Sequence, residues 1–162
     1  MNDEQRLADA IDYSEIRRLQ DAYADVVSRR QWHELHELFL ADVVLELDLR
    51  DNTMRFTGPT EIGNFIGRAV ALFEFFQFGI LGTRVHLRSH DDPNRAAARM
   101  YMTELRQTPD GHWSQVYGVY HDQFARVDNR WWFAHRHYHS LARNNQPATV
   151  FDFPHQIRLD EL

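Results

Sequence analysis

The sequence predicts an α+β domain, in which a cone-shaped, curved antiparallel sheet wraps around N-terminal helices and leaves a central pocket. One observation is the helical spacing of early apolar residues, at Ile16, Leu19, Tyr23 and Val26. The other is a C-terminal half made of long alternating segments joined by turn sequences such as DDPN and PDGH. Long strands beside an apolar helix curl around it, which gives a cone with one open mouth.

The individual elements follow from local signals taken in chain order. Ser14 marks the start of the first helix, and a second helical segment is predicted over 32–40. A third helix is predicted over 61–76, and Gly79 and Gly82 end it. Strands are expected at 43–50, 55–58, 83–90, 95–108, 113–127 and 131–143.

Length and composition limit the classes of function. The 162 residues fit one domain, which we expect to be a cone over 1–143. The tail over 144–162 is expected to belong to it or to dock on a neighbouring subunit. A net charge of −6 without a Lys/Arg run argues against nucleic acid and anionic membranes as partners. The chain has no cysteine, its first residues do not resemble a signal peptide, and no apolar run could cross a bilayer, so we expect a cytoplasmic protein.

Three histidines alternate along the last predicted strand, at His135, His137 and His139. Side chains two apart on a strand lie about 7 Å from each other, so the outer two are roughly 14 Å apart, too far for one zinc ion. We therefore expect no metal. If Arg136 faces the pocket, the histidines face the convex side, where they are expected to form a pH-sensitive interface in a homo-oligomer, a trimer or dimer.

Three segments carry a resemblance to a known family, and the resemblance covers roughly residues 10–143. They are YADVVSRRQWHELHELFLADVVLE, FTGPTEIGNF and YHDQFARVDNRWWFAHRHYHSL. The chain resembles the SnoaL-like branch of the nuclear transport factor 2-like superfamily, which includes polyketide cyclases, scytalone dehydratase and a hexachlorocyclohexane dehydrochlorinase. The resemblance implies the cone fold and suggests which positions to inspect.

In the dehydratase and dehydrochlorinase types, four side chains act together: a Tyr or Lys and an Asp on the first helix, a His at the end of the third helix, and an Arg on the last strands. Carried onto this chain, the resemblance implies Tyr23 for the Tyr and Arg136 for the Arg. The Asp position falls on Ser28, and the His position falls on Gly79 or Ile80. The Asp–His dyad that removes a proton in these relatives is therefore not retained.

Arg136 is the leading candidate for contact with a substrate. Strand alternation puts four further residues on its face, namely Trp132, Ala134, Tyr138 and Ser140. A buried guanidinium needs a partner, which is either an anionic or phenolate ligand or Asp122 on the neighbouring strand. Tyr120 shares the face of Asp122, and Tyr23 is either core or a phenol in the pocket. The predicted catalytic residues are Tyr23, Tyr120 and Arg136.

The predicted substrate-binding residues are Ser28, Leu45, Phe75, Phe78, Asp122 and Ser140. Aromatic residues at the end of the third helix are expected to form a flat apolar wall for a ring-shaped substrate. The resemblance thus implies a lyase, dehydratase or isomerase that needs no cofactor and acts on an apolar ring-containing or aromatic small molecule. The alternative is a non-catalytic ligand-binding protein, or a structural subunit that resembles the β chain of a ring-hydroxylating dioxygenase.

Overall fold

The computed structural model describes residues 2–144, 149–150 and 162. Most of the predicted tail over 144–162 therefore lies outside the described residues. Three helices lie in the first half, α1 (Asp3–Arg29), the 3-10 helix η1 (Trp32–Glu37) and α2 (Pro59–Val70), and a short 3-10 helix η2 (Ser89–Asp91) follows β3. The strands are β1 (Phe39–Asp48), β2 (Thr53–Thr57), β3 (Phe75–Leu87), β4 (Arg95–Gln107), β5 (Trp113–Val127), β6 (Arg130–Arg143) and β7 (Thr149–Val150).

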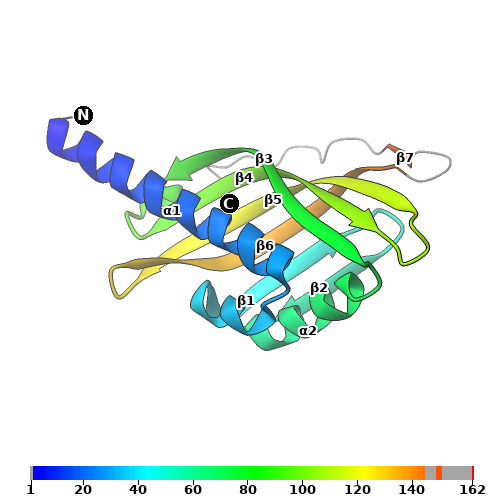
Figure 1. Cartoon of the computed structure of the whole chain (residues 1–162). Coiled ribbons are helices and arrows are strands. Elements are labelled where there is room, and N and C mark those ends of the chain that lie inside the picture. Colours follow the sequence, from blue (N-terminus) through cyan, green and yellow to red (C-terminus); the bar gives the residue numbers. More distant parts are fainter. Residues whose placement is uncertain (1, 145–148, 151–161) are drawn as a thin grey trace.

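The strands form one curved, unclosed sheet in the order β2-β1-β6-β5-β4-β3, and β7 pairs with the end of β6 (Figure 1). Neighbouring strands are antiparallel except for β1 and β6, which run parallel. Figure 1 shows α1 crossing the sheet and α2 lying beside the β1–β2 hairpin. The predicted α+β cone is therefore confirmed. No helix in the described part of the chain is long and apolar enough to cross a membrane.

Helix α1 begins at Asp3, well before the predicted start at Ser14. The Asn2 side chain accepts a hydrogen bond from the Gln5 backbone N–H at 2.8 Å, which caps the helix. Acidic residues in the first turn, Asp3 and Glu4, also suit the positive end of the helix dipole. These capping signals, rather than the apolar periodicity, decide where the helix begins.

The predicted third helix is correct up to Val70 and wrong beyond it. Phe75 already begins β3, and the strand then pairs with β4, with Phe76 opposite Arg106. Gly79 and Gly82 thus lie inside a strand and do not end a helix. Alternating phenylalanines favour a strand once a neighbouring strand offers a ladder of hydrogen bonds, which a reading of one segment does not include.

The prediction that Trp132 and Ala134 share the face of Arg136 is also wrong. The register between β5 and β6 shifts opposite Gln123 and Phe124, and such a bulge reverses which side chains point inward. The inward residues before the shift are therefore Trp131 and Phe133, and those after it are Arg136, Tyr138 and Ser140, while His139, which is also buried, lies on the other face.

Candidate functional site

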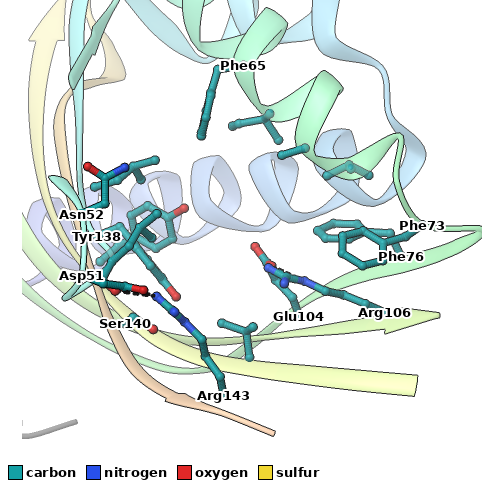
Figure 2. Close-up of a pocket in the computed structure, with 17 residues that line it drawn as sticks. Asp51, Asn52, Phe65, Phe73, Phe76, Glu104, Arg106, Tyr138, Ser140 and Arg143 are labelled. Atoms are coloured by element: carbon teal, nitrogen blue, oxygen red, sulfur yellow. Dashed lines mark hydrogen bonds and ion pairs between the residues drawn. The ribbon is translucent and has the colours of Figure 1, made fainter. Parts of the chain in front are cut away.

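A cavity of about 520 Å³ opens between α2, the β1–β2 hairpin and the inner face of the sheet. Its apolar wall comes from α2 and β3 and from the link between them, and includes Phe65, Phe73 and Phe76 (Figure 2). Its polar groups come from the β1–β2 turn and from β4, β5 and β6, and they are Asp51, Asn52, Glu104, Arg106, Tyr120, Tyr138, Ser140 and Arg143. The volume suits a small organic molecule.

Glu104 and Arg106 lie two residues apart on the inner face of β4 and form an ion pair. The Arg106 Nε donates to Glu104 Oε2 at 2.9 Å, and the guanidinium carbon lies 5.0 Å from the centre of the Phe73 ring. Within the described residues, the other carboxylate oxygen, Oε1, has no hydrogen-bond partner. One oxygen of Glu104 is thus fixed, and the second is available at the cavity wall (Figure 2).

Tyr138 lies across the sheet from this ion pair. Its ring covers the backbone of Gly118, where an added Cβ would lie 2.2 Å from Cε2 and 2.6 Å from the hydroxyl oxygen. Only glycine therefore leaves room for this ring position. Burial, helped by the negative charge of Glu104, raises the pKa of Tyr138 to about 12, so its hydroxyl stays protonated and can donate at neutral pH.

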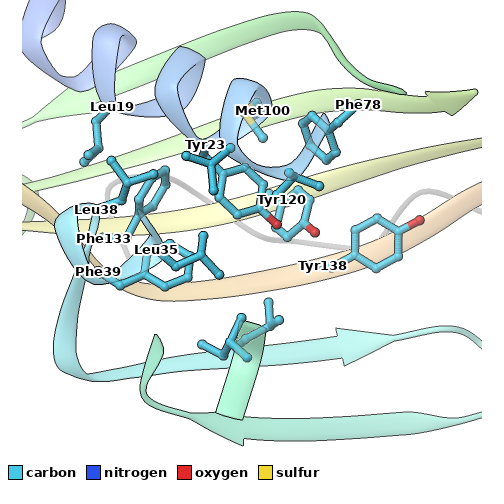
Figure 3. Close-up of a cluster of buried hydrophobic side chains, with 14 of the residues drawn as sticks. Leu19, Tyr23, Leu35, Leu38, Phe39, Phe78, Met100, Tyr120, Phe133 and Tyr138 are labelled. Atoms are coloured by element: carbon cyan, nitrogen blue, oxygen red, sulfur yellow. The ribbon is translucent and has the colours of Figure 1, made fainter. Parts of the chain in front are cut away.

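A row of tyrosines connects the cavity to the narrow part of the cone (Figure 3). Tyr120 lines the cavity and its ring centre lies 5.1 Å from that of Tyr138 and 6.3 Å from that of Tyr23. Burial raises the pKa of both Tyr23 and Tyr120. All three phenols therefore remain neutral hydrogen-bond donors.

Arg136 and Asp122 form an ion pair behind this row, with side chains only 1% and 0% exposed. The Arg136 Nε donates to Asp122 Oδ1 at 2.7 Å, and Nη2 donates to Oδ2 at 3.2 Å. The guanidinium carbon lies 4.0 Å from the ring centres of both Tyr23 and Tyr120. Burial alone would lower the pKa of Arg136, but the Asp122 carboxylate raises it, so the pair is charged. Of the two partners considered for Arg136, the structure shows the carboxylate.

The remaining predicted residues divide between the cavity and its surroundings. Of the nine predicted catalytic and substrate-binding residues, two line the cavity, Tyr120 and Ser140. Leu45 and Phe78 are buried in the core near Tyr23, Arg136 and Asp122. Phe75 is 39% exposed and packs on Trp113, away from the cavity.

Ser28 connects α1 to β3. Its hydroxyl accepts a hydrogen bond from the Phe78 N–H at 3.0 Å and lies 3.5 Å from the Phe78 carbonyl oxygen. Ser28, at the position of the family's Asp, therefore lies next to the start of the 79–80 segment, where the family's His would be. Here Ser28 forms a hydrogen bond to the backbone in place of an acid–base pair.

The sequence reading missed Glu104, Arg106 and Arg143 as cavity residues. A signal existed for the first two, because Met100 and Met102 are buried and the alternation of β4 continues through them to Glu104 and Arg106. No such signal existed for Arg143, since the register shifts again where Gly118 pairs with Ser140.

The histidines of β6 lie on the other face of the sheet. Glu46 lies 3.5 Å from His135 and 3.8 Å from His137, and Asp48 lies 3.4 Å from His139. Across the residues described, no group of three or more histidine and carboxylate side chains is arranged to hold a metal ion.

Comparison with known proteins places this geometry in a family. No curated protein matches the sequence. A hexachlorocyclohexane dehydrochlorinase from Novosphingobium barchaimii superposes with a TM-score of 0.73 at 15% identity, over 94% of this chain and 99% of its own. A proposed scytalone dehydratase from Novosphingobium aromaticivorans superposes with a TM-score of 0.73 at 16% identity, over 91% and 92%.

A nuclear transport factor 2-like protein from Salmonella enterica superposes with a TM-score of 0.67 at 18% identity, over 78% of this chain and 89% of its own. At these identities the likeness concerns the fold, which this chain therefore shares with a dehydrochlorinase. The family model of the SnoaL-like domain matches residues 8–137. The chain belongs to the SnoaL-like family.

Proposed function

We propose that this protein is a cofactor-independent lyase or isomerase that moves a proton on an apolar, ring-containing small molecule bound in the cavity. The observation that carries the proposal is Glu104, whose one oxygen is held by Arg106 while the other is available to a ligand. A carboxylate that is held by an arginine on one side and lines a partly apolar cavity is suited to act as a general base.

In this proposal, Glu104 Oε1 takes a proton from a carbon of the substrate, and Tyr138 donates to the oxygen on which negative charge develops. In an isomerisation, Glu104 returns the proton to a different carbon. In a dehydration, the C–O bond breaks as the C=C bond forms, and Tyr138 protonates the departing oxygen to give water. The proton on Glu104 then restores the phenol.

The residues predicted as catalytic receive different roles in this mechanism. Tyr120 touches the ligand, because it lines the cavity. Tyr23 and Arg136 are positioning residues, since both are buried and reach the cavity only through Tyr120. Arg136 holds both rings by cation–π contact, which fixes the hydroxyl of Tyr120 at the cavity wall.

The apolar wall supports an aromatic or polycyclic substrate class. Phe65 stacks on Phe56 with ring centres 4.2 Å apart, so its orientation is fixed before a ligand binds. Phe73 is held from the other side by Arg106. Preformed aromatic surfaces of this kind bind flat rings at a low entropic cost.

The test begins with a thermal-shift screen of phenolic, polycyclic, steroidal and polyketide-like compounds, followed by turnover assays on the compounds that bind. We expect Glu104→Gln to keep binding and to lose about 10²–10⁴-fold in turnover. Glu46→Gln is the matched control, because Glu46 also pairs with an arginine, Arg55, but lies on the other face of the sheet. Full activity in Glu104→Gln would refute the assignment of the base.

A non-catalytic role is the second candidate, and one observation favours it. The positions of the family's acid–base dyad fall on Ser28 and on Gly79 or Ile80, and Ser28 is engaged with the backbone of Phe78. A structural subunit that resembles a dioxygenase β chain would show no thermal shift with any compound of the panel. That result would refute the enzyme proposal and would direct the search to a partner protein.

A further inference from the structure

The first turns of α1 present two different faces. One face is tied to the sheet side of the protein, because Arg88 donates to Asp9 at 2.6 and 2.8 Å and Trp131 Nε1 donates to Asp12 at 3.1 Å. The opposite face carries Leu7, which is 63% exposed, and Ile11, which is 50% exposed. Figure 1 shows this part of the helix extending past the strands.

The exposed face has the spacing of a helix-pairing seam. Its residues alternate three and four apart, and they are Glu4, Leu7, Ile11, Ser14 and Arg18. Alanines flank the seam at Ala8 and Ala10, so a second helix can approach closely. We call these five residues the α1 seam. A seam of this length on a helix that is already held from its other side is preformed for a partner helix.

The seam also contains a socket of the kind found in coiled coils. A surface depression is lined by Ala10, Ile11, Ser14, Glu15 and Arg18. Four of these residues, at 11, 14, 15 and 18, have the relative spacing 0, 3, 4 and 7, which is the set that surrounds an inserted side chain between paired helices. The socket therefore has the arrangement that accepts a side chain from a facing helix.

We propose that the α1 seam pairs antiparallel with the α1 seam of a second copy of this chain, about a two-fold axis at Ile11. Glu4 and Arg18 lie seven residues before and seven residues after Ile11, so each Glu4 would face the Arg18 of the other copy. Neither side chain has an ion-pair partner within the described residues. A parallel pair would instead place like charges together, which is destabilising.

The same register fills the socket. With Ile11 facing itself, Leu7 of one helix lies opposite position 15 of the other, at the centre of the depression. The symmetric arrangement thus uses the exposed leucine, both free charges and the socket at once. A pair of crossing helices buries less area than a standard interface of about 800 Å² per partner, so the dimer is expected to depend on concentration.

The first test uses the absence of cysteine from the chain. Ile11→Cys places one thiol per chain on the two-fold axis, and mild oxidation with oxidised glutathione joins two such thiols while the glutathione is reduced. We expect rapid formation of a disulfide-linked dimer. Tyr13→Cys is the matched control, because Tyr13 is 46% exposed on the same helix and points about 160° away from Ile11. Equal cross-linking of the two variants would overturn the proposal.

The second test is a charge exchange, read as molecular mass by light scattering over a range of concentrations. Glu4→Arg and Arg18→Glu should each weaken the dimer at least tenfold, because each places like charges together. The double variant should restore it, because the pair is then formed with the charges reversed. Unchanged mass in both single variants, or no restoration in the double variant, would overturn the proposal. An oligomer that responds only to His137→Glu would also overturn it and would assign assembly to the histidine face.

Discussion

The close fit between Gly118 and Tyr138 gives the sharpest prediction about stability and function together. Gly118→Ala would place a methyl group 2.2 Å from Tyr138 Cε2 and 2.6 Å from both Cζ and the hydroxyl oxygen. No real contact is this short, so the Tyr138 ring must leave its position above the strand. The phenol that we propose as proton donor would leave with it.

The magnitude follows from two opposing effects. Replacing glycine by alanine in a strand reduces the entropy of the unfolded chain, which stabilises by about 0.4–1 kcal/mol. Forcing an extra methyl into a packed site costs about 1–3 kcal/mol. The clash wins, so we expect a net loss of up to about 2.5 kcal/mol. For a domain of 162 residues this lowers the Tm by up to roughly 10 °C.

The assay is urea unfolding together with thermal shift by the best ligand. Gly82→Ala is the matched control, since an added Cβ there meets nothing within 4 Å, and it should leave the stability equal or higher. In a Tyr138→Ala background, adding Gly118→Ala should no longer destabilise the protein, because the ring with which the new methyl group would clash is absent. Wild-type stability and ligand response in Gly118→Ala would refute the reasoning.

Three further predictions concern residues outside the cavity. Ser28→Ala leaves the Phe78 N–H without its partner, so the free energy of unfolding in urea should fall by about 1–3 kcal/mol. A loss below about 0.5 kcal/mol, the lower limit for a net hydrogen bond, would contradict this role. Asp122→Ala leaves Arg136 buried and unpaired and should lower the free energy of unfolding by about 3–5 kcal/mol. The double variant Asp122→Leu with Arg136→Met should recover much of this loss, because no buried charge remains. Unchanged stability in Asp122→Ala would show that the pair is not buried. Burial lowers the pKa of His121 to about 3, so the unfolded chain binds more protons below pH 6.5 and stability should fall as the pH drops from 6.5 towards 3, by at most about 1.4 kcal/mol per pH unit. His121→Gln should reduce that slope in acid unfolding, and an identical slope would exclude His121 as its cause.

The fold was predictable because its signals are local and repeated. Alternation over β4, β5 and β6 identifies these strands, and the buried spacing of α1 identifies the helix that they enclose. The errors occur where a distant partner decides the outcome, as at Phe75, where pairing with β4 converts a predicted helical end into a strand.

The site was predictable only in part, because β-bulges change which residues of a strand face inward. Reading β6 with strict alternation gives the correct face for Tyr138 and Ser140, which lie between the two register shifts, and fails at Trp132 and Arg143, which lie beyond them. A bulge leaves no local sequence signature in this strand. The face of each residue therefore depends on pairing with β5, which only the three-dimensional structure supplies.

The two inward carboxylate–arginine pairs of the cone show why residue type alone did not identify the end at which we propose the reaction. Asp122 with Arg136 and Glu104 with Arg106 are equivalent in composition, and each pair has a guanidinium near an aromatic ring. In the first pair both carboxylate oxygens accept from the arginine and no surface is exposed, so its charge is already balanced and cannot respond to a ligand. In the second pair, among the residues that the structure describes, only one carboxylate oxygen is engaged, and the Arg106 and Glu104 side chains keep 27% and 19% of their surface, so the pair is open to a ligand in the cavity. Chemistry is therefore expected at the cavity end of the cone, and stability is expected to depend on the buried end.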